Sequence, residues 1–280
     1  LFFILSLVLS GLGAFWLSRY LTKNAWAGFV GGAIFAFAPF HFAHIGHMTV
    51  FSVQWIPLFI LFFINMFEEK LWRNAVFAAI FWAANCYTDL NYAVFMGVFV
   101  VIFLLFQLKY AKQQLFSKEY LKRFLLMVIA FFVLVGPYAL AIIKATLFSE
   151  IKINVPVQHS VSQSADILSF FVPSFMHPIF GSLVKPFYEH ITTYNGTWLG
   201  GYIEVTTFIG FTTIILVIFA LRHFGTARLR LWIIMATVFF ILTLGPVLMV
   251  HGLVQIPAEW LHLDKFAQRI EPNLDPLALE

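Results

Sequence analysis

Long apolar runs, separated by short polar or charged breaks, dominate the chain. A bilayer core about 30 Å thick is crossed by roughly 17–25 mostly apolar helical residues, or by fewer where neighbouring helices shield the ends. Two runs are short, Ala25–Pro39 and Asn74–Thr88, and we expect them to continue into the polar residues that follow or to stop early inside the protein. Breaks marked by charge or proline leave eight candidate spans: Leu1–Leu17, Ala25–Pro39, Phe51–Phe67, Asn74–Thr88, Tyr92–Leu108, Phe124–Ile143, Val205–Leu221 and Leu231–Val250.

The runs are continuous, without the ten-residue alternation of apolar and polar positions that marks a membrane β-barrel. Inside lipid, a helix satisfies all its backbone hydrogen bonds within one segment. Composition agrees, since 61% of residues are hydrophobic and 11% are charged, against about 45–50% and 25% in soluble domains. We therefore predict an all-α fold, a polytopic transmembrane helical bundle of about eight spans in a multi-pass protein.

The lysines and arginines fall mainly in four of the breaks. Short positively charged loops stay in the cytoplasm, which predicts that the first span runs from outside to inside. The net charge of +4 is then a topology signal, and nothing in it supports a nucleic-acid partner. Twelve of the 17 basic residues share the predicted cytoplasmic side: Arg19, Lys23, Lys70, Arg73, Lys109, Lys112, Lys118, Lys122, Arg123, Arg222, Arg228 and Arg230.

We expect one transmembrane domain over residues 1–280, containing an extracytoplasmic loop at 144–204 and an irregular C-terminal segment at 251–280. The loop is far longer than the usual connection of a few residues. Its stretch Ile167–Phe180 is too aromatic for disorder, so it should lie on the membrane surface as short helices broken by proline. Leu1 stands inside an apolar run, so we expect a fragment that lacks an earlier helix and a first external loop.

Three histidines lie close together in the stretch PFHFAHIGHM, residues 39–48. On a helix, His41, His44 and His47 would spread over about 120° of one face, and with Gln54 they could converge on one ligand. The alternative is that histidine and phenylalanine rings simply occupy the membrane interface, and the sequence leaves both open. Zinc is disfavoured and no metal site is predicted, because histidines on a zinc-binding helix are usually four apart and no carboxylate follows in register.

Carboxylates and a further histidine lie in other external segments. Asp89, in the hairpin CYTDLNY, is either the N-cap of the next helix or a group facing a cavity. Asp166 either caps a helix that starts at Ile167 or takes part in catalysis, and His177 belongs to the same surface layer. Eight of the nine histidines, all except His223, fall on the predicted outer side. The working face should therefore point away from the cytoplasm.

The order of these motifs resembles the GT-C-type polytopic glycosyltransferases of bacterial and archaeal membranes, over about Leu1 to Gly252. The resemblance is carried by FAFAPFHFAHIGHMTVFSVQWIPL, CYTDLNYAVF, SADILSFFVPSFMHPIFG and EVTTFIGFTTIILVIFAL. It implies an enzyme of the plasma membrane, the bacterial inner membrane, that takes a sugar from a lipid-linked polyprenyl-phosphate donor. The acceptor, a glycan, lipid or protein, would receive the sugar on the extracytoplasmic face.

The resemblance also places the principal catalytic acid in an external loop upstream of Leu1, which leaves Asp89 and Asp166 as the remaining catalytic candidates. The predicted substrate-binding residues are His41, His44, His47, Gln54 and His177. Mg²⁺ or Mn²⁺ would suit this chemistry, because hard cations pair with carboxylates and phosphates, although no ligand set is visible.

Two other functions stay open at this point. A multispan transporter often carries paired broken helices in two related halves, and this sequence shows no internal symmetry. A non-catalytic component of polysaccharide or envelope assembly would need the same helices without the chemistry. An upstream loop with paired acids would favour the enzyme, and a repeat of the present helix pattern would favour transport.

Overall fold

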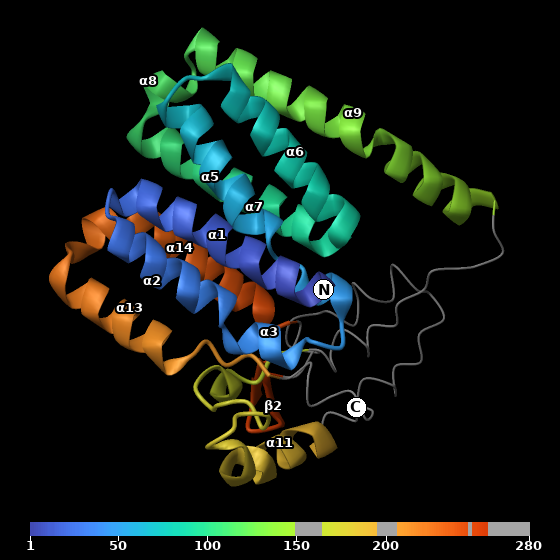
Figure 1. Cartoon of the computed structure of the whole chain (residues 1–280), viewed down its shortest axis with the longest axis vertical. Coiled ribbons are helices and arrows are strands. Elements are labelled where there is room, and N and C mark those ends of the chain that lie inside the picture. Colours follow the sequence, from blue (N-terminus) through green and yellow to red (C-terminus); the bar gives the residue numbers. More distant parts are fainter. Residues whose placement is uncertain (149–163, 195–205, 246–247, 257–280) are drawn as a thin grey trace. The chain divides into compact units, whose positions relative to one another are not determined.

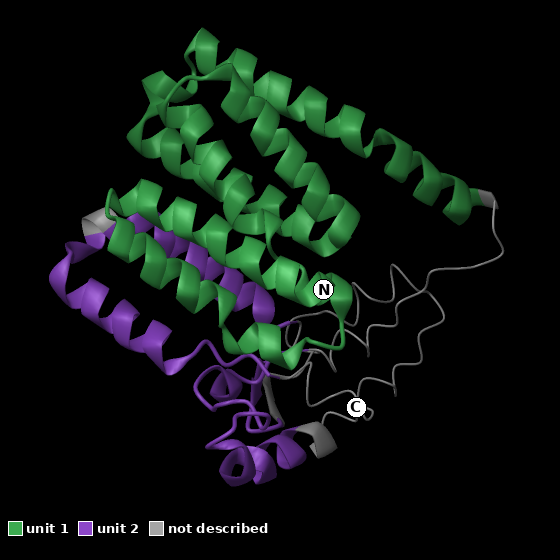
Figure 2. Cartoon of the chain, viewed as in Figure 1, with its two compact units in different colours: residues 1–152 green, residues 153–280 purple. Residues whose placement is uncertain are grey.

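Helices make up almost all of the regular structure in the computed structural model, as the apolar runs predict. The structure describes residues 1–148, 164–194, 206–245 and 248–256. The chain divides into two compact units, Leu1–Lys152 and Ile153–Glu280, where the sequence suggested one transmembrane domain (Figure 2). Each unit is described by itself below.

The first unit consists of helices joined by short connections (Figure 1). Asn24 shows how such a connection is built, because its side-chain oxygen accepts hydrogen bonds from the backbone N–H groups of Trp26 at 2.8 Å and Ala27 at 3.2 Å. This N-cap satisfies donors at the start of a helix. The helices are α1 Phe2–Thr22, α2 Ala25–Ala36, α3 Pro39–Ala43, α4 Met48–Phe51, α5 Trp55–Glu68, α6 Trp72–Thr88, α7 Leu90–Tyr110, α8 Lys112–Leu115 and α9 Lys118–Phe148.

Glycines let α1 and α2 approach closely, and the two helices lie side by side (Figure 1). A Cβ atom at Gly28 would lie 2.9 Å from Cβ of Arg19, and one at Gly32 would lie 2.7 Å from the carbonyl oxygen of Gly11. Small residues four apart are a common device for packing helices in lipid, where apolar side chains gain nothing by leaving the bilayer. The α1–α2 pair therefore depends on the absence of side chains at these positions.

Helix α5 forms the core of the first unit. Phe59 and Phe63 on it are fully buried, and the ring of Phe63 lies 6.0 Å from Phe99 and 5.1 Å from Phe103 of α7, in edge contacts. Edge-to-face aromatic pairs of this kind add about 0.5–1.5 kcal/mol beyond area burial. The aromatic residues of the predicted third span thus provide internal packing as well as hydrophobicity.

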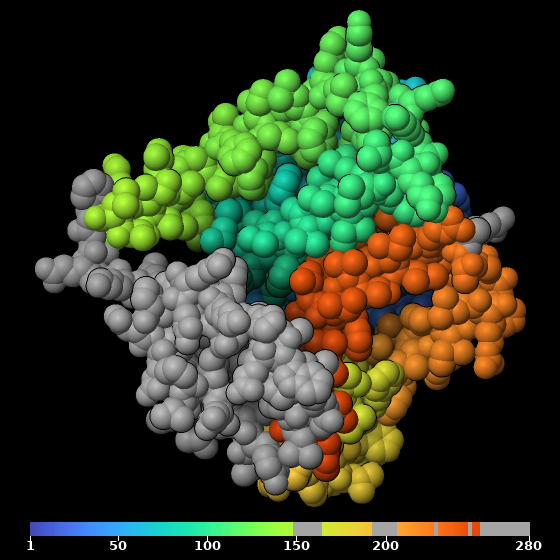
Figure 3. Space-filling view, turned by 180° about the vertical axis from the view of Figure 1, so that it is seen from behind, coloured from blue at the N-terminus to red at the C-terminus, as the bar shows by residue number. Residues whose placement is uncertain are grey.

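Helix α9 lies at the surface of the first unit (Figure 3). It packs on α6 through Trp82 and Phe131, whose rings stack at 4.4 Å. Tyr120, Met127 and Val135 of this helix are also buried, whereas many of its remaining apolar side chains are exposed, including Phe132 and Val133. In a membrane these apolar side chains would face lipid, which is why their exposure carries no penalty there.

The second unit pairs apolar helices with a small hairpin. Strands β1 and β2 are antiparallel, and the turn between them has positive φ at His251 (53°) and Gly252 (78°), as a two-residue hairpin of type I′ requires. The elements are the 3₁₀ helix η1 Ile167–Phe170, α11 Gly181–Tyr194, α13 Phe211–His223, α14 Gly225–Thr243, β1 Leu248–Val250 and β2 Leu253–Ile256.

The hairpin corrects two sequence predictions. The last predicted span, Leu231–Val250, stays helical only to Thr243, because Gly245 takes a positive φ of 71° that ends the helix, and its final residues form β1. The segment 251–280, predicted to be irregular, begins with the tight turn and β2. Residues 257–280 lie outside the described residues.

The external loop is less helical at Ile167–Phe180 than the sequence predicts. Only the η1 turn forms there, followed by non-helical residues that include Pro173 and Pro178, which cannot donate backbone hydrogen bonds. The longer helix, α11, begins at Gly181. At its start the loop is shorter than predicted, since α9 continues to Phe148, and residues 149–163 and 195–205 are not among those described.

The chain is a membrane protein by the length and apolarity of its helices. Two shorter apolar helices, Phe211–His223 and Leu229–Thr243, overlap the last two predicted spans, and α6 is 17 residues long. The figure of eight crossings and their direction stay predictions. Five helical segments in the described part are long and apolar enough to cross a bilayer: Phe2–Thr22, Ala25–Ala43, Met48–Glu68, Leu90–Tyr110 and Lys118–Leu147.

Candidate functional site

Polar side chains gather at one end of the first unit, where α1, α5 and α7 begin and α2 and α6 end (Figure 1). Short contacts connect these helix ends: the rings of Phe3 and Phe51 lie 5.0 Å apart, and the Tyr92 hydroxyl donates a hydrogen bond to the carbonyl oxygen of Val50. The predicted topology puts this end outside. We call it the polar end, made up of Ser6, Ser10, His41, His44, His47, Gln54, Asp89 and Tyr92.

His41 is buried inside the polar end. Its side chain is 1% exposed, and its ring lies 6.1 Å from the ring of Phe35, 6.0 Å from Phe40 and 5.0 Å from Phe51. Neither ring nitrogen has a hydrogen-bond partner among the described residues, and the nearby Phe35 carbonyl misses hydrogen-bond geometry. Leaving a buried polar group unpaired costs about 1–3 kcal/mol. His41 is therefore a polar ring held in an aromatic box at an energetic cost.

His44 and His47 lie in different surroundings from His41, although the spacing in sequence is the same. Helix α3 ends at Ala43, so the three histidines do not share one continuous helix face. His44 is buried, with Nδ1 2.9 Å from the carbonyl oxygen of Phe40, whereas His47 is exposed at the start of α4. Their rings are 6.4 Å apart. Of the three histidines, only His47 is exposed at the surface, and the ring of His44 lies beneath it.

Gln54 takes part in a buried contact that the sequence did not reveal. The Ser6 hydroxyl of α1 donates a hydrogen bond of 2.6 Å to Oε1 of Gln54, and both residues are buried. Ser10 lies one turn further along α1, and its hydroxyl is buried without a partner among the described residues. In the sequence, this polar contact was indicated only by two serines four residues apart in an apolar helix. They give α1 a narrow polar stripe that leads into the polar end.

Asp89 caps α7, as one of the two sequence hypotheses stated. Its Oδ1 accepts a hydrogen bond of 2.9 Å from the backbone N–H of Asn91. The side chain is half-buried, and its second oxygen accepts no hydrogen bond from the residues that the structure describes. Capping therefore uses one carboxylate oxygen and leaves the other available. Tyr92, three residues on, ties this hairpin to the segment that carries α4.

Asp166 and His177 both belong to the second unit and act there as local caps. Asp166 is 1% exposed; its Oδ1 accepts from the N–H of Leu168 at 2.9 Å and its Oδ2 from that of Gly252 at 2.7 Å. The predicted cap at the start of η1 is confirmed. Nδ1 of His177 accepts from two backbone N–H groups, those of Ile179 and Phe180, at 3.2 Å each. Both oxygens of Asp166 are thus engaged, which leaves little capacity for substrate.

Tyr188 lies in the buried interior of the second unit. Its hydroxyl donates to the carbonyl oxygen of Val172 at 3.0 Å, and the side chain is fully buried. Burial raises the pKa of Tyr188 to about 12, while a hydrogen bond with Thr206 acts in the opposite direction and the charge of Asp166 adds to the rise. The unit therefore has a packed interior, and Tyr188 stays a neutral phenol at ordinary pH.

The polar end offers hydrogen bonds, without an evident metal site. Within the described ranges, no three His, Cys, Asp or Glu side chains are grouped so as to hold a metal ion. The groups present are imidazoles, an amide, hydroxyls and one half-engaged carboxylate. Imidazole and amide N–H groups donate to phosphate or sugar oxygens, and a carboxylate accepts from a hydroxyl. The arrangement can therefore bind a polar, anionic ligand at the end of an apolar bundle.

Comparison with known proteins gives one match. A family described as a domain of unknown function (DUF6311) matches residues 1–268. No curated protein and no solved structure matches the chain.

Proposed function

The chain belongs to the DUF6311 family, and we propose that it transfers a sugar from a polyprenyl-phosphate donor to an acceptor on the extracytoplasmic face of the plasma membrane. The family match assigns no activity, so support comes from the residues. The observation that carries the proposal is His41, a buried ring without hydrogen-bond partners among the described residues, set among polar residues at the end of the bundle that the charge rule places outside. Intramembrane polar groups of this kind commonly mark a substrate path.

The reaction would be a displacement at the anomeric carbon of the donor sugar. The acceptor hydroxyl oxygen forms the new bond to that carbon, the bond to the phosphate oxygen breaks, and the polyprenyl phosphate leaves with the electron pair. The hydroxyl proton passes to a base. His44, His47 and the amide of Gln54 are suited to stabilise the leaving phosphate through N–H donors. Asp89 is the described carboxylate at this end.

Access to His41 requires the α3–α4 segment to shift. The two helices have five and four residues, too short to be stable without packing. Between them Gly46 has open space around it, with no atom within 4 Å of a Cβ built there. A ligand that displaced this segment would give the His41 nitrogens the partners that the described part of the chain does not provide.

The experiment measures sugar transfer by the full-length protein in lipid nanodiscs, with a radiolabelled polyprenyl-phosphate hexose as donor. His44→Phe is compared with His223→Phe, because Nδ1 of His223 is likewise 2.9 Å from the carbonyl four residues earlier, and its ring stacks on Phe219 at 4.0 Å. Charge-assisted hydrogen bonds contribute about 1.5–3 kcal/mol, so His44→Phe should reduce turnover roughly ten- to a hundredfold. His223→Phe, on the predicted cytoplasmic side, should not.

His41→Phe separates function from folding. A phenyl ring fits the aromatic box and removes two unpaired nitrogens, so thermal stability should stay equal or rise while turnover falls. If folded His41→Phe, His44→Phe and His47→Ala all keep wild-type turnover and donor affinity, the polar end is not the site of transfer.

A further inference from the structure

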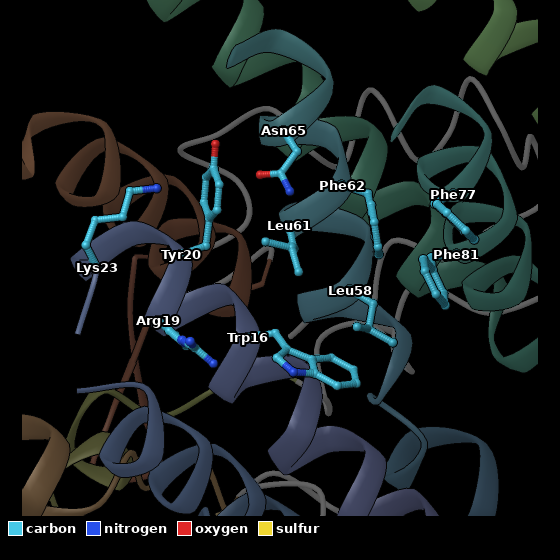
Figure 4. Close-up of a pocket in the computed structure, with 10 residues that line it drawn as sticks. All are labelled: Trp16, Arg19, Tyr20, Lys23, Leu58, Leu61, Phe62, Asn65, Phe77 and Phe81. Carbon is cyan, nitrogen blue, oxygen red and sulfur yellow. The ribbon is translucent and has the colours of Figure 1, made fainter. Parts of the chain in front are cut away.

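A cavity of about 730 Å³ lies between α1, α5 and α6 of the first unit (Figure 4). Its lining follows helical spacing, because α1 contributes a stripe from Trp16 to Lys23 and α5 one from Leu58 to Asn65. The volume falls within the range of about 300–1,000 Å³ typical of ligand sites. The α1 stripe ends at the C-terminus of the helix, the opposite end from Ser6 and the polar end.

The α1 side of the cavity is basic. Arg19 and Lys23 both line it and are exposed, and no acidic side chain of the described structure pairs with Arg19. Lys23 Nζ lies 3.8 Å from the ring centroid of Tyr20, whose hydroxyl donates to a carboxylate oxygen of Glu68 at 2.6 Å. Lys23 thus lies over an aromatic ring, and neither Lys23 nor Arg19 forms an ion pair with an acidic side chain in the described part of the chain, so both cations can meet an anion.

The opposite side is an aromatic wall. Rings of Phe77 and Phe81 on α6 lie 4.9 Å and 5.5 Å from that of Phe62 on α5, and Leu58 and Leu61 continue the apolar surface (Figure 4). Such a wall suits a hydrocarbon chain. Together with the basic edge it gives the cavity the two-part character of a lipid, charged at one side and apolar at the other.

Asn65 provides the second polar feature. It lines the cavity (Figure 4) and is 9% exposed, yet its Oδ1 atom is buried with no hydrogen-bond partner in the described part of the chain. Buried acceptors are nearly always paired. A turn of the Asn65 amide toward the cavity would let a ligand hydroxyl supply the missing donor.

We propose that this cavity binds one anionic phospholipid of the cytoplasmic leaflet. The phosphate lies between Arg19 and Lys23, an acyl chain follows the aromatic wall, and a head-group hydroxyl donates to Oδ1 of Asn65. The predicted topology puts this end at the cytoplasmic surface, where anionic lipids attract basic residues. The proposal rests on that topology and on the cavity, and is independent of glycosyl transfer, whose donor is assigned to the polar end.

Native mass spectrometry of the full-length protein, titrated with phosphatidylglycerol, tests the proposal. Phosphatidylcholine with the same acyl chains is the neutral reference. One phosphatidylglycerol should be retained in preference, and the double variant Arg19→Gln, Lys23→Gln should weaken its binding roughly ten- to thirtyfold. The control is Lys118→Gln with Lys122→Gln, the same loss of charge on the same predicted side; Lys122 is exposed and pairs with Glu119 at 3.3 Å. The control should bind as wild type.

Asn65→Leu provides a second test that does not change charge. Phosphatidylglycerol should raise the melting temperature of the wild type, and at least half of that rise should be lost in Asn65→Leu, even if the variant alone melts higher. Equal binding of the two lipids, an equal loss in the control pair, or an unchanged lipid-induced rise in Asn65→Leu would overturn the proposal. So would displacement of phosphatidylglycerol by a lower concentration of polyprenyl phosphate, which would assign the cavity to the carrier lipid.

Discussion

Gly32→Ala should weaken the α1–α2 pair by adding a single methyl group. That methyl carbon would lie 2.7 Å from the carbonyl oxygen of Gly11 and 3.1 Å from Cβ of Phe15. Carbon and oxygen atoms without a bond or hydrogen bond between them do not approach so closely, and a helix backbone cannot yield as a flexible side chain can. The two helices must therefore separate along the contact that α2 makes with α1.

Two opposing free energies set the size of the effect. Overpacking of this kind lowers the free energy of unfolding by about 1–3 kcal/mol. Replacing glycine by alanine inside a helix raises it by up to about 1 kcal/mol. Gly97→Ala in α7 isolates the second contribution, because a Cβ there meets only a ring atom of Trp82 at 3.8 Å. The difference in unfolding free energy between the two variants should thus be about 1–3 kcal/mol, with Gly32→Ala the less stable.

Equilibrium unfolding of detergent-solubilised protein, followed by tryptophan fluorescence, measures both variants under the same conditions. Circular dichroism checks that helix content is unchanged in each. The reasoning is refuted if Gly32→Ala is as stable as Gly97→Ala, because the two changes differ only in what the new methyl group contacts.

Three further predictions concern topology and the second unit. A thiol reagent added outside intact cells should label a cysteine placed at Glu189 and not one placed at Lys118. Equal labelling of both would contradict the predicted arrangement. Asp166→Asn should lower the melting temperature, because an amide has one acceptor oxygen and its nitrogen cannot accept from the second N–H group. The lost hydrogen bond costs about 1–3 kcal/mol, and a Tm equal to that of the wild type would argue against this contact. The raised pKa of Tyr188, about 12 in the folded state against about 10 unfolded, adds stability that is present below pH 10 and lost as pH rises through 12. Ultraviolet titrations of the wild type and of Tyr188→Phe should not differ in phenolate absorbance below pH 11, because Tyr188 stays neutral there.

Features set by neighbouring residues could be predicted from the sequence. The apolar runs become helices because each satisfies its own backbone within lipid, whichever partners it finds. Asp89 and Asp166 could be identified as caps because a cap bonds to N–H groups only two residues away. Positive charges beside the runs give a topology prediction for the same local reason.

Features that depend on distant partners could not be predicted. Equal spacing in sequence does not reveal that His41 is boxed by aromatic rings while His47 is exposed, because the break between α3 and α4 changes their direction. Gln54 finds Ser6 across 48 residues of sequence. The close contact of Gly32 with the backbone of Gly11 likewise joins two helices and appears only in the structure.

The hydrogen bond between Asp166 and Gly252 also limits when this part of the second unit can fold during synthesis of the chain. Its two residues are 86 positions apart, and at about 5–20 residues per second a ribosome needs roughly 4–17 s to make the chain between them. Both α13 and α14 are produced in that interval. Until Gly252 has been made, the Asp166 carboxylate accepts only the local hydrogen bond from Leu168. It must then stay in water, because a charge without enough partners is too costly to bury. The contact between Asp166 and the hairpin can thus form only after α13 and α14 have been made, and a chain that stops before Gly252 leaves Oδ2 of Asp166 without this N–H donor.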